Sequence, residues 1–419
     1  MSHPALSAAT ALCLAFTVAC SGDGGPGGVG TTEAIPSPAG PASGEPFVAP
    51  DGDGVLMSWL ERNGEGHDFR FARYDGVAWT EPVTIAHRSD FFVNWADFPS
   101  VRVGADGTLW AHWLERGAQG GYDYGVRIVH STDAGRSWSD AWTPHEDGTP
   151  TEHGFVSAFP DVDGTMGFVW LDGRATAAAA GAAGHGAAHR GAMTLRYRDV
   201  SVAGEGAGFA PGAETLLDPS VCDCCQTSAA LTEQGPVVVY RNRTEDEIRD
   251  IYVMRRVDGA WTEGAPVHDD GWLIGGCPVN GPAVAADGSA VAVAWFTAAE
   301  DVARAKVAFS SDAGANFGPP TVVDDGNPAG RVDVLLLDDG AALVVWLERT
   351  GGDAAEVRMR VVAPDGTMGG SRAVSATTST RPSGFPRVAP LGDGRFLVAW
   401  TDARETETRV RTATLALDR

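Results

Sequence analysis

Four cysteines beyond the N-terminal segment are the residues whose type and spacing could do chemistry. Cys222, Cys224 and Cys225 fill three of four consecutive positions, and Cys277 lies farther along the chain. Thiolates are soft ligands that select Cu(I) or Zn(II). In an oxidising compartment the same residues could instead form two disulfides. The Cys-x-Cys-Cys spacing differs from the Cys-x-x-Cys pairs of zinc ribbons, so a copper or zinc centre and a disulfide staple both stay open here.

Chain geometry restricts the disulfide alternative. If Cys277 takes one clustered cysteine, the other two must bond within a short loop, as Cys222 with Cys225 or in a tighter arrangement. Disulfides need Cα atoms about 4.4 to 6.8 Å apart, and strained disulfides are the more reducible ones. In the metal alternative, His153 or histidines of a nearby insertion complete the ligand set.

An apolar segment that ends in an aromatic residue recurs seven times and predicts the fold. The aromatics are spaced 51 to 70 residues apart, at Trp59, Trp113, Trp170, Tyr240, Trp295, Trp346 and Trp400. Such a near-constant period is typical of repeat folds, and Asp-Gly turns between apolar runs indicate hairpins. The sequence predicts an all-β chain with a single β-propeller of four-stranded antiparallel blades over residues 45–419. Seven blades are favoured and six are the alternative.

Two features interrupt the regular repeat. The last copy lacks a fourth strand, which the segment near residues 34–36 could supply to close the ring. The 70-residue interval contains an Ala/Gly-rich insertion over residues 175–193 that carries His185 and His189. Its composition predicts a low-complexity loop. A flexible lid that carries imidazoles over the channel is the functional alternative.

Strand order predicts that one face of the propeller carries the polar groups. The innermost strands line the channel, and their starts lie on the same face as the ends of the second strands. Residues before the innermost strands should therefore converge on the channel mouth, with charged residues that follow the second strands around it. The first set comprises the cysteines with Asp97, Glu152, His153, Arg331 and Arg387, and the second includes Asp172, Arg174, Arg241 and Arg243.

Several of these residues have both a structural and a functional interpretation. The charged ring is typical of ion pairs between blades, whereas Arg331 with Arg241 or Arg243 could clamp a carboxylate, because a guanidinium fork matches that group. His153 is typical of a hydrogen-bonded structural residue, or of a metal ligand beside the cysteines. The candidate ligand-binding residues are Arg243, Glu152, Asp172 and Arg174.

Two turns between third and fourth strands match the Asp-box pattern, Ser-x-Asp-x-Gly-x-x-aromatic. They cover residues 131–138 and 310–317. In such a turn the Asp accepts backbone N–H bonds and the Gly takes a positive φ. With these turns, most of residues 45–417 resembles the sialidase-like (BNR-repeat) β-propellers.

The resemblance implies an active site only in part. Enzymes of that family hold a carboxylate with three arginines and use a Tyr activated by a Glu, together with an Asp acid/base. The chain has no Arg-Ile-Pro motif near its first blade, and no Tyr follows Tyr252, so the nucleophile is missing unless Tyr240 replaces it. The catalytic candidates that the resemblance implies are Asp97, Arg241 or Arg243, Arg331 and Arg387.

The N-terminus predicts export. Residues 1–20 have an apolar centre before Ala19 and Cys20, as in a lipoprotein-type signal peptide whose Cys20 is lipidated; an ordinary secretory leader is the alternative. Residues 21–44 are rich in Gly, Pro and Ser and predict a flexible tether. We therefore expect an extracytoplasmic protein, in the periplasm or at the cell surface, held through a lipid anchor only. It would be secreted if Cys20 is not used.

Charge and hydropathy limit the classes of molecule that the protein could bind. The net charge of −24 disfavours nucleic acid, which needs a basic surface. No interior run reaches the roughly 18 apolar residues of a membrane span. We expect a monomer with a carbohydrate or another small ligand. Two functions remain: a propeller that binds a ligand or metal without glycosidase chemistry, and a sialidase-type glycoside hydrolase for acidic sugars.

Overall fold

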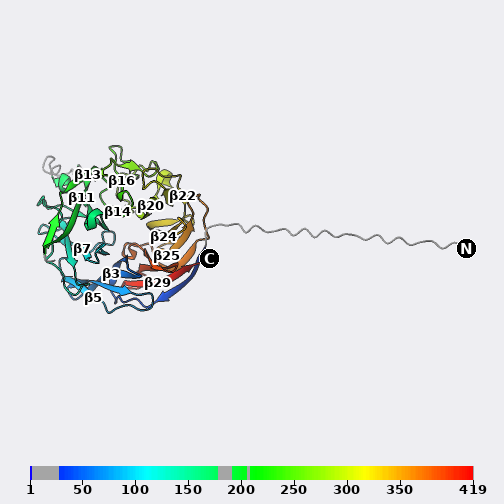
Figure 1. Cartoon of the computed structure of the whole chain (residues 1–419), viewed down its shortest axis with the longest axis horizontal. Helices are drawn as coiled ribbons and strands as arrows, with labels where there is room; N and C mark the ends of the chain where they lie inside the picture. The colour runs from blue at the N-terminus through cyan, green and yellow to red at the C-terminus, as the bar shows by residue number, and fades with distance from the viewer. Residues whose placement is uncertain (2–27, 178–190, 205–207, 419) are drawn as a thin grey trace.

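Seven antiparallel sheets form a ring in chain order, which confirms the seven-bladed β-propeller (Figure 1). The computed structural model describes residues 1, 28–177, 191–204 and 208–418. The predicted signal peptide with Cys20, and His185 and His189 of the insertion, lie outside the described residues. Three short 3-10 helices interrupt the strands: η1 (Val162–Gly164), η2 (Ala299–Asp301) and η3 (Arg381–Ser383).

The first three blades follow the expected up-and-down order. Blade 1 contains β2 (Ser43–Asp51), β3 (Gly54–Asn63), β4 (Gly66–Tyr74) and β5 (Val83–Arg88). Blade 2 contains β6 (Ser100–Val103), β7 (Leu109–Arg116) and β8 (Tyr124–Ser131), with an outer bridge between Ile128 and Trp142. Blade 3 contains β9 (His153–Pro160), β10 (Met166–Asp172), β11 (Met193–Ala203), β12 (Gly208–Pro211) and β13 (Thr215–Val221).

The other four blades complete the ring. Blade 4 contains β14 (Ser228–Thr232), β15 (Gly235–Arg241), β16 (Ile251–Val257), β17 (Ala260–Trp261) and β18 (Ala265–Pro266). Blade 5 contains β19 (Ala283–Asp287), β20 (Ala290–Thr297), β21 (Arg304–Ser310) and β22 (Thr321–Val322). Blade 6 contains β23 (Pro328–Leu336), β24 (Ala342–Gly351), β25 (Ala354–Val362) and β26 (Arg372–Thr378). Blade 7 contains β27 (Arg387–Gly392), β28 (Arg395–Asp402) and β29 (Arg409–Leu417), with β1 (Val29–Ile35) at its outer edge.

The N-terminal strand closes the ring, as the incomplete last repeat predicted. β1 pairs antiparallel with β29, with Ile35 opposite Thr412 and Val29 opposite Leu417. The predicted tether over residues 21–44 therefore extends too far, because its last part forms β1 and the start of β2. The composition of this segment hid a strand whose partner lies at the other end of the chain.

Gly30→Val is expected to destabilise the propeller by about 1 to 3 kcal/mol, the usual range for overpacking. A Cβ at Gly30 would lie 2.7 Å from the Ala416 carbonyl oxygen, so β1 must shift away from β29. Urea unfolding monitored by Trp fluorescence measures the change. Glu33→Gln, at an exposed position of the same strand, is the control, and equal midpoints for the two variants would contradict this account of closure.

The core lies between the blades, where the repeated aromatics pack. Trp59, Trp170, Trp295 and Trp346 are fully buried at the ends of second strands. Three of their indole N–H groups donate to an acid two residues later: Trp59 to Glu61, Trp170 to Asp172 and Trp346 to Glu348. In these three blades the repeat therefore supplies an anchoring hydrogen bond as well as an apolar face.

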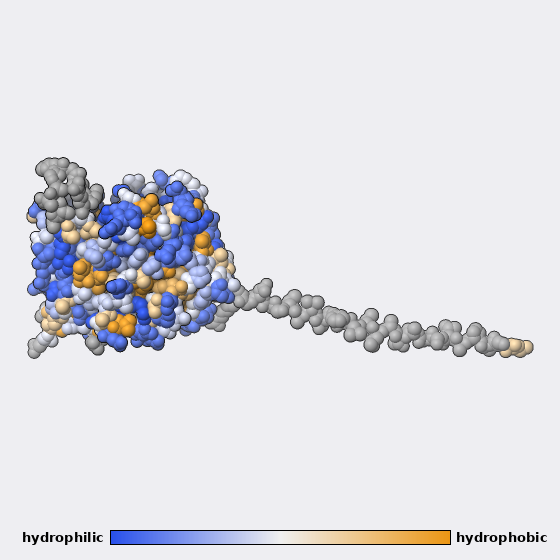
Figure 2. Space-filling view, turned by 90° about the horizontal axis from the view of Figure 1, so that it is seen from above, coloured by the Kyte–Doolittle hydropathy of each residue, from blue (hydrophilic) through white to orange (hydrophobic). Residues whose placement is uncertain are grey.

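The outer surface is polar and mixed. On the side of the propeller seen in Figure 2, hydrophobic residues form small separate groups among hydrophilic ones. Within the described residues, none of the helices has the length and hydropathy of a membrane span. The two matching turn sequences have the same hydrogen bonds: Asp133 accepts from the backbone of Ser137, and Asp312 accepts from that of Asn316.

Candidate functional site

The cysteine loop joins blade 3 to the innermost strand of blade 4. It follows β13 and precedes β14, so it reaches the face where the innermost strands begin. The backbone N–H of Cys222 donates to the Arg241 carbonyl at 2.9 Å and fixes the loop to the end of β15. Cys222 and Cys225 are 1% and 2% exposed, and Cys224 is half-buried.

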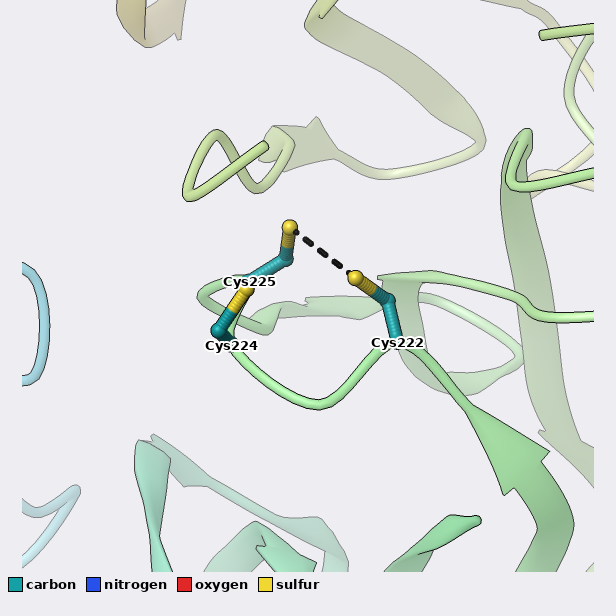
Figure 3. A group of neighbouring side chains, drawn as sticks. All are labelled: Cys222, Cys224 and Cys225. Carbon is teal, nitrogen blue, oxygen red and sulfur yellow. Dashed lines mark hydrogen bonds between the residues drawn. The ribbon is translucent and has the colours of Figure 1, made fainter. Parts of the chain in front are cut away.

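The thiols of this loop converge. The sulfur atoms of Cys222 and Cys225 face each other at 3.5 Å (Figure 3), and the sulfur atoms of Cys222, Cys224 and Cys225 all lie within 4.8 Å of one another. Cys277 comes from the loop before blade 5, where it is exposed, and its thiol interacts with that of Cys224. All four are free thiols in the structure.

Positive charge borders the cluster. The Arg249 Nη1 lies 3.4 Å from the Cys222 sulfur. Hydrogen bonds from the Cys224 and Cys225 thiols hold the pKa of Cys222 well below its usual range, and the charge of Arg241 acts in the same direction. Burial raises the pKa of Cys225. The cationic Arg249 and the neighbouring thiols thus all face the Cys222 sulfur.

Acidic residues surround these arginines. Arg243 pairs with Asp223 at 3.3 Å and with Glu247 at 2.6 Å. Arg249 also pairs with Glu247, at 2.7 Å. Arg243, a candidate ligand-binding residue, therefore holds the cysteine loop through Asp223.

Arg241 is a structural residue, contrary to its candidate catalytic role. Its side chain is 2% exposed and donates to the carbonyl oxygens of Asn280, Arg249 and Phe296, at 2.8, 2.6 and 2.7 Å. The guanidinium also lies over the Trp272 ring, 4.8 Å from its centroid. Its donors are directed to backbone groups of blades 4 and 5, so it does not clamp a carboxylate.

Arg331 has the same structural role two blades farther on, in blade 6. It is 6% exposed and donates to the carbonyl oxygens of Thr380, Gly384 and Ser379, at 2.9, 3.2 and 3.0 Å. The guanidinium lies 4.5 Å from the centroid of the Trp95 ring. The expected clamp of Arg331 with Arg241 or Arg243 is therefore wrong, because these arginines bind protein groups of neighbouring loops.

Asp172 and Arg174 form a buried ion pair that anchors blade 3. Asp172 is 0% exposed and accepts from the Trp170 indole at 2.9 Å. Arg174 binds both of its carboxylate oxygens, at 2.7 and 2.6 Å, and also pairs with Glu214 at 2.8 Å. These ion pairs are structural, but they lie within blade 3 rather than between blades.

His153 contacts Asp147 and His145, which form a group of side chains separate from the cysteine cluster. Its Nε2 lies 3.0 Å from the Asp147 carboxylate, and its ring stacks on His145 with 3.9 Å between centroids. The prediction that His153 completes the cysteine ligand set is therefore wrong. His145 and Asp147 were not predicted from the sequence, because the loop that carries them has no regular pattern.

The His145, Asp147 and His153 set does not offer three metal ligands. The His145 Nε2 accepts from the Val126 backbone N–H at 3.1 Å, so a neutral His145 carries its proton on the nitrogen that faces Asp147. Burial lowers the pKa of His145 to about 3, which keeps the ring neutral. Arg174 also lies 3.3 Å from the Asp147 carboxylate. The set is a hydrogen-bonded network.

Asp97 and Glu152 share a tyrosine that sequence reasoning missed. The Tyr124 hydroxyl lies 3.3 Å from the Asp97 carboxyl and 3.5 Å from that of Glu152. Burial raises the pKa of Asp97 to about 8 and that of Glu152 to about 7. Burial also raises the pKa of Tyr124 well above its usual range, so this phenol is a hydrogen-bond donor. In the sequence, only the position of Tyr124 at the start of a third strand could have identified it as part of this group.

Asp97→Asn is expected to flatten the pH dependence of stability. Because the folded pKa of Asp97, about 8, exceeds its ordinary 3.8, the stability contributed by its proton is present at low pH and lost as pH rises through about 8. The amide stays neutral and can still accept from the Phe155 backbone N–H, which binds Asp97 at 2.7 Å. Urea midpoints between pH about 6 and about 9 measure the effect. Parallel curves for wild type and variant would contradict it, and Asp53→Asn at an exposed turn is the control.

The channel encloses a cavity of about 510 Å³. Its wall includes Asp97, the predicted Arg387, and Arg102, which was not predicted. The Arg102 guanidinium lies 4.4 Å from the centroid of Phe47, and that of Arg387 lies 4.5 Å from the centroid of Phe98. Within the described part of the chain, the Nε atoms of both arginines have no hydrogen-bond partner.

Asp333 is the carboxylate of the cavity wall that pairs with one of these arginines, and Asp97, Asp287 and Asp338 also line the cavity. Asp333 lies 3.5 Å from Arg387 and accepts from the Val388 backbone N–H at 2.9 Å. Burial lowers the pKa of Arg102 to about 10, so it stays cationic at neutral pH. The cavity wall therefore carries two arginines among several acidic residues.

Comparisons with known proteins agree with the fold. A protein of unknown function from Dyadobacter fermentans DSM 18053 is 14% identical, with 94% of this chain and 98% of that chain covered and a TM-score of 0.50. The polysaccharide lyase Uly1 is 10% identical, with 90% of each chain covered and a TM-score of 0.52. The GH93 α-L-arabinofuranosidase of Fusarium graminearum is 12% identical, with 76% and 91% covered and a TM-score of 0.48.

The first two similarities show the propeller fold alone, because the identities are low. No protein-family model matches the chain, and no curated protein matches it.

Proposed function

We propose that the protein binds a soft metal ion, Cu(I) or Zn(II), at the channel mouth through its cysteine cluster. The observation that carries this proposal is the convergence of three free thiols within 4.8 Å of one another. Thiolates at this spacing surround a point from which each could reach a metal at the usual Zn–S distance of about 2.3 Å. Cys277 supplies a fourth thiol beside Cys224.

The surroundings of the cluster support a metal over an inert staple. Burying thiolates is costly unless positive charge offsets them, and Arg249 contacts the Cys222 sulfur directly. A disulfide is uncharged and needs no such partner. The contact of Arg249 with the Cys222 sulfur therefore favours thiols held as anions, as metal ligands are.

Metal content and free-thiol count, measured together on protein purified without chelator, test the proposal. We expect about one copper or zinc ion per chain and reduced thiols. Protein without metal whose four cysteines are all in disulfides by mass spectrometry would refute it. The cluster would then be a staple of the loop between blades 3 and 4.

Two arginines of the cavity wall whose Nε atoms have no hydrogen-bond partner within the described residues support a second candidate function, a glycoside hydrolase or binding protein for acidic sugars. Arg102 and Arg387 have donors available for a carboxylate, and Asp97 in the same wall can act as a general acid, since its pKa is about 8. A panel of fluorogenic sialosides and uronides tests it. Cleavage or binding that is lost in Arg102→Gln supports this function, and no response across the panel excludes it.

For the location, we propose an extracytoplasmic lipoprotein anchored through Cys20. The apolar segment and the Ala19-Cys20 pair support this. Cys20→Ser is expected to move the protein from the membrane fraction to the soluble fraction. Membrane association unchanged by this substitution would refute lipidation.

A further inference from the structure

The four thiols differ in their access to solvent. Cys222 and Cys225 are almost fully buried, Cys224 is half-buried, and Cys277 is exposed. Cys277 interacts with the outermost of the other three, Cys224. The thiols thus form a short path from solvent to the buried sulfur atoms of Cys222 and Cys225.

Cys277 lies on a loop that is fixed on both sides of its tip. Before the tip, the Ile274 backbone N–H donates to the Glu247 carbonyl at 3.0 Å. After it, the Asn280 carbonyl accepts from Arg241 at 2.8 Å. Between them, Gly275 and Gly276 have no neighbours within 4 Å of where a Cβ would lie. The tip that carries Cys277 therefore has room and backbone freedom to move, while its ends stay in place.

The inner three thiols form a set of their own. The sulfur atoms of Cys222, Cys224 and Cys225 all lie within 4.8 Å of one another, and this set does not include Cys277. Zn(II) in structural sites is almost always bound by four ligands, whereas soft sulfur ligands also select Cu(I). Three thiolates with Cu(I) leave a net negative charge, which Arg249 and Arg241 partly offset.

We infer that the inner three thiolates bind Cu(I) and that Cys277 is the exchange ligand through which the ion enters and leaves. This inference rests on the proposed metal-binding function. A donor or acceptor with a thiolate or thioether group would meet Cys277 first and pass the ion by ligand exchange. Copper stays Cu(I) throughout; each incoming thiol loses its proton to solvent as its sulfur binds the metal, and each departing thiolate regains one.

Anaerobic titration of the full chain with Cu(I), in competition with the chelator bathocuproine disulfonate, tests the inference. Three variants are compared with wild type: Cys277→Ser, Cys222→Ser, and Leu273→Ala as a control on an exposed residue of the same loop. Stoichiometry is read from the equilibrium titration. Transfer of Cu(I) from loaded protein to chelator is followed by stopped flow, and X-ray absorption counts the sulfur ligands.

We expect Cys277→Ser to keep about one Cu(I) with three sulfur ligands, to change affinity by less than roughly tenfold, and to slow transfer several-fold. It should also lose Zn(II). Cys222→Ser should bind no Cu(I), and Leu273→Ala should behave as wild type.

Two results would overturn the inference while leaving the proposed function intact. One is loss of Cu(I) in Cys277→Ser equal to that in Cys222→Ser, which would make Cys277 a full ligand. The other is unchanged transfer kinetics in Cys277→Ser. Wild-type protein that binds neither Cu(I) nor Zn(II) would instead refute the proposed function and this inference with it.

Discussion

Cys222→Ser is expected to reduce bound metal from about one ion per chain to none that can be measured. Cys222 is the thiol that contacts both Cys225 and Arg249, so its loss removes the buried thiolate around which the other ligands converge. Serine has nearly the same size, and its hydroxyl is a poor ligand for soft metals. Inductively coupled plasma mass spectrometry of purified protein measures the effect.

Folding must be monitored in the same samples, because Cys222 is 1% exposed. Circular dichroism and the urea midpoint of Cys222→Ser should match those of metal-free wild type. Ser220→Ala, two residues earlier in the same segment, is the control that should retain metal. Retention of a full complement of metal by folded Cys222→Ser would rule out the cluster as the site.

Arg241→Met is expected to lower the free energy of unfolding by about 3 to 5 kcal/mol, because several buried acceptors lose their donor at once. The substitution leaves the carbonyl oxygens of Asn280, Arg249 and Phe296 without their donor. Each such buried group costs about 1 to 3 kcal/mol. Urea unfolding measures the change.

Arg62→Met is the matched control, because Arg62 also lies at the end of a second strand but its side chain is exposed. Its effect should stay within about 0.5 kcal/mol. Equal stabilities for the two variants would show that Arg241 is not a structural anchor, and its catalytic candidacy would then return.

The propeller could be predicted because its determinants are local and repeated. An aromatic at the end of each second strand and a turn after it recur in every copy, and each copy makes the same hairpins whatever its neighbours are. The closing strand was predicted only because the seventh copy was incomplete. Its pairing with β29 depends on residues at the far end of the chain, so composition alone assigned part of it to a tether.

The site was harder to predict because its partners come from different blades. Spacing along the chain placed Arg241, Arg331 and His153 on one face, but it carries no information on which way a side chain turns. Arg241 turns toward a backbone carbonyl of the next blade, and His153 turns toward Asp147. Arg102 was missed because it lies inside an innermost strand, where a charged residue interrupts an apolar pattern only once.

The pairing of β1 with β29 also has a kinetic consequence. The two halves of one sheet are separated by nearly the whole chain, so this contact has a very high sequence separation and its loop must close late in folding. A chain still being made holds β1 without a partner until its last residues emerge. Until then the open ring presents a free sheet edge, where another chain could pair.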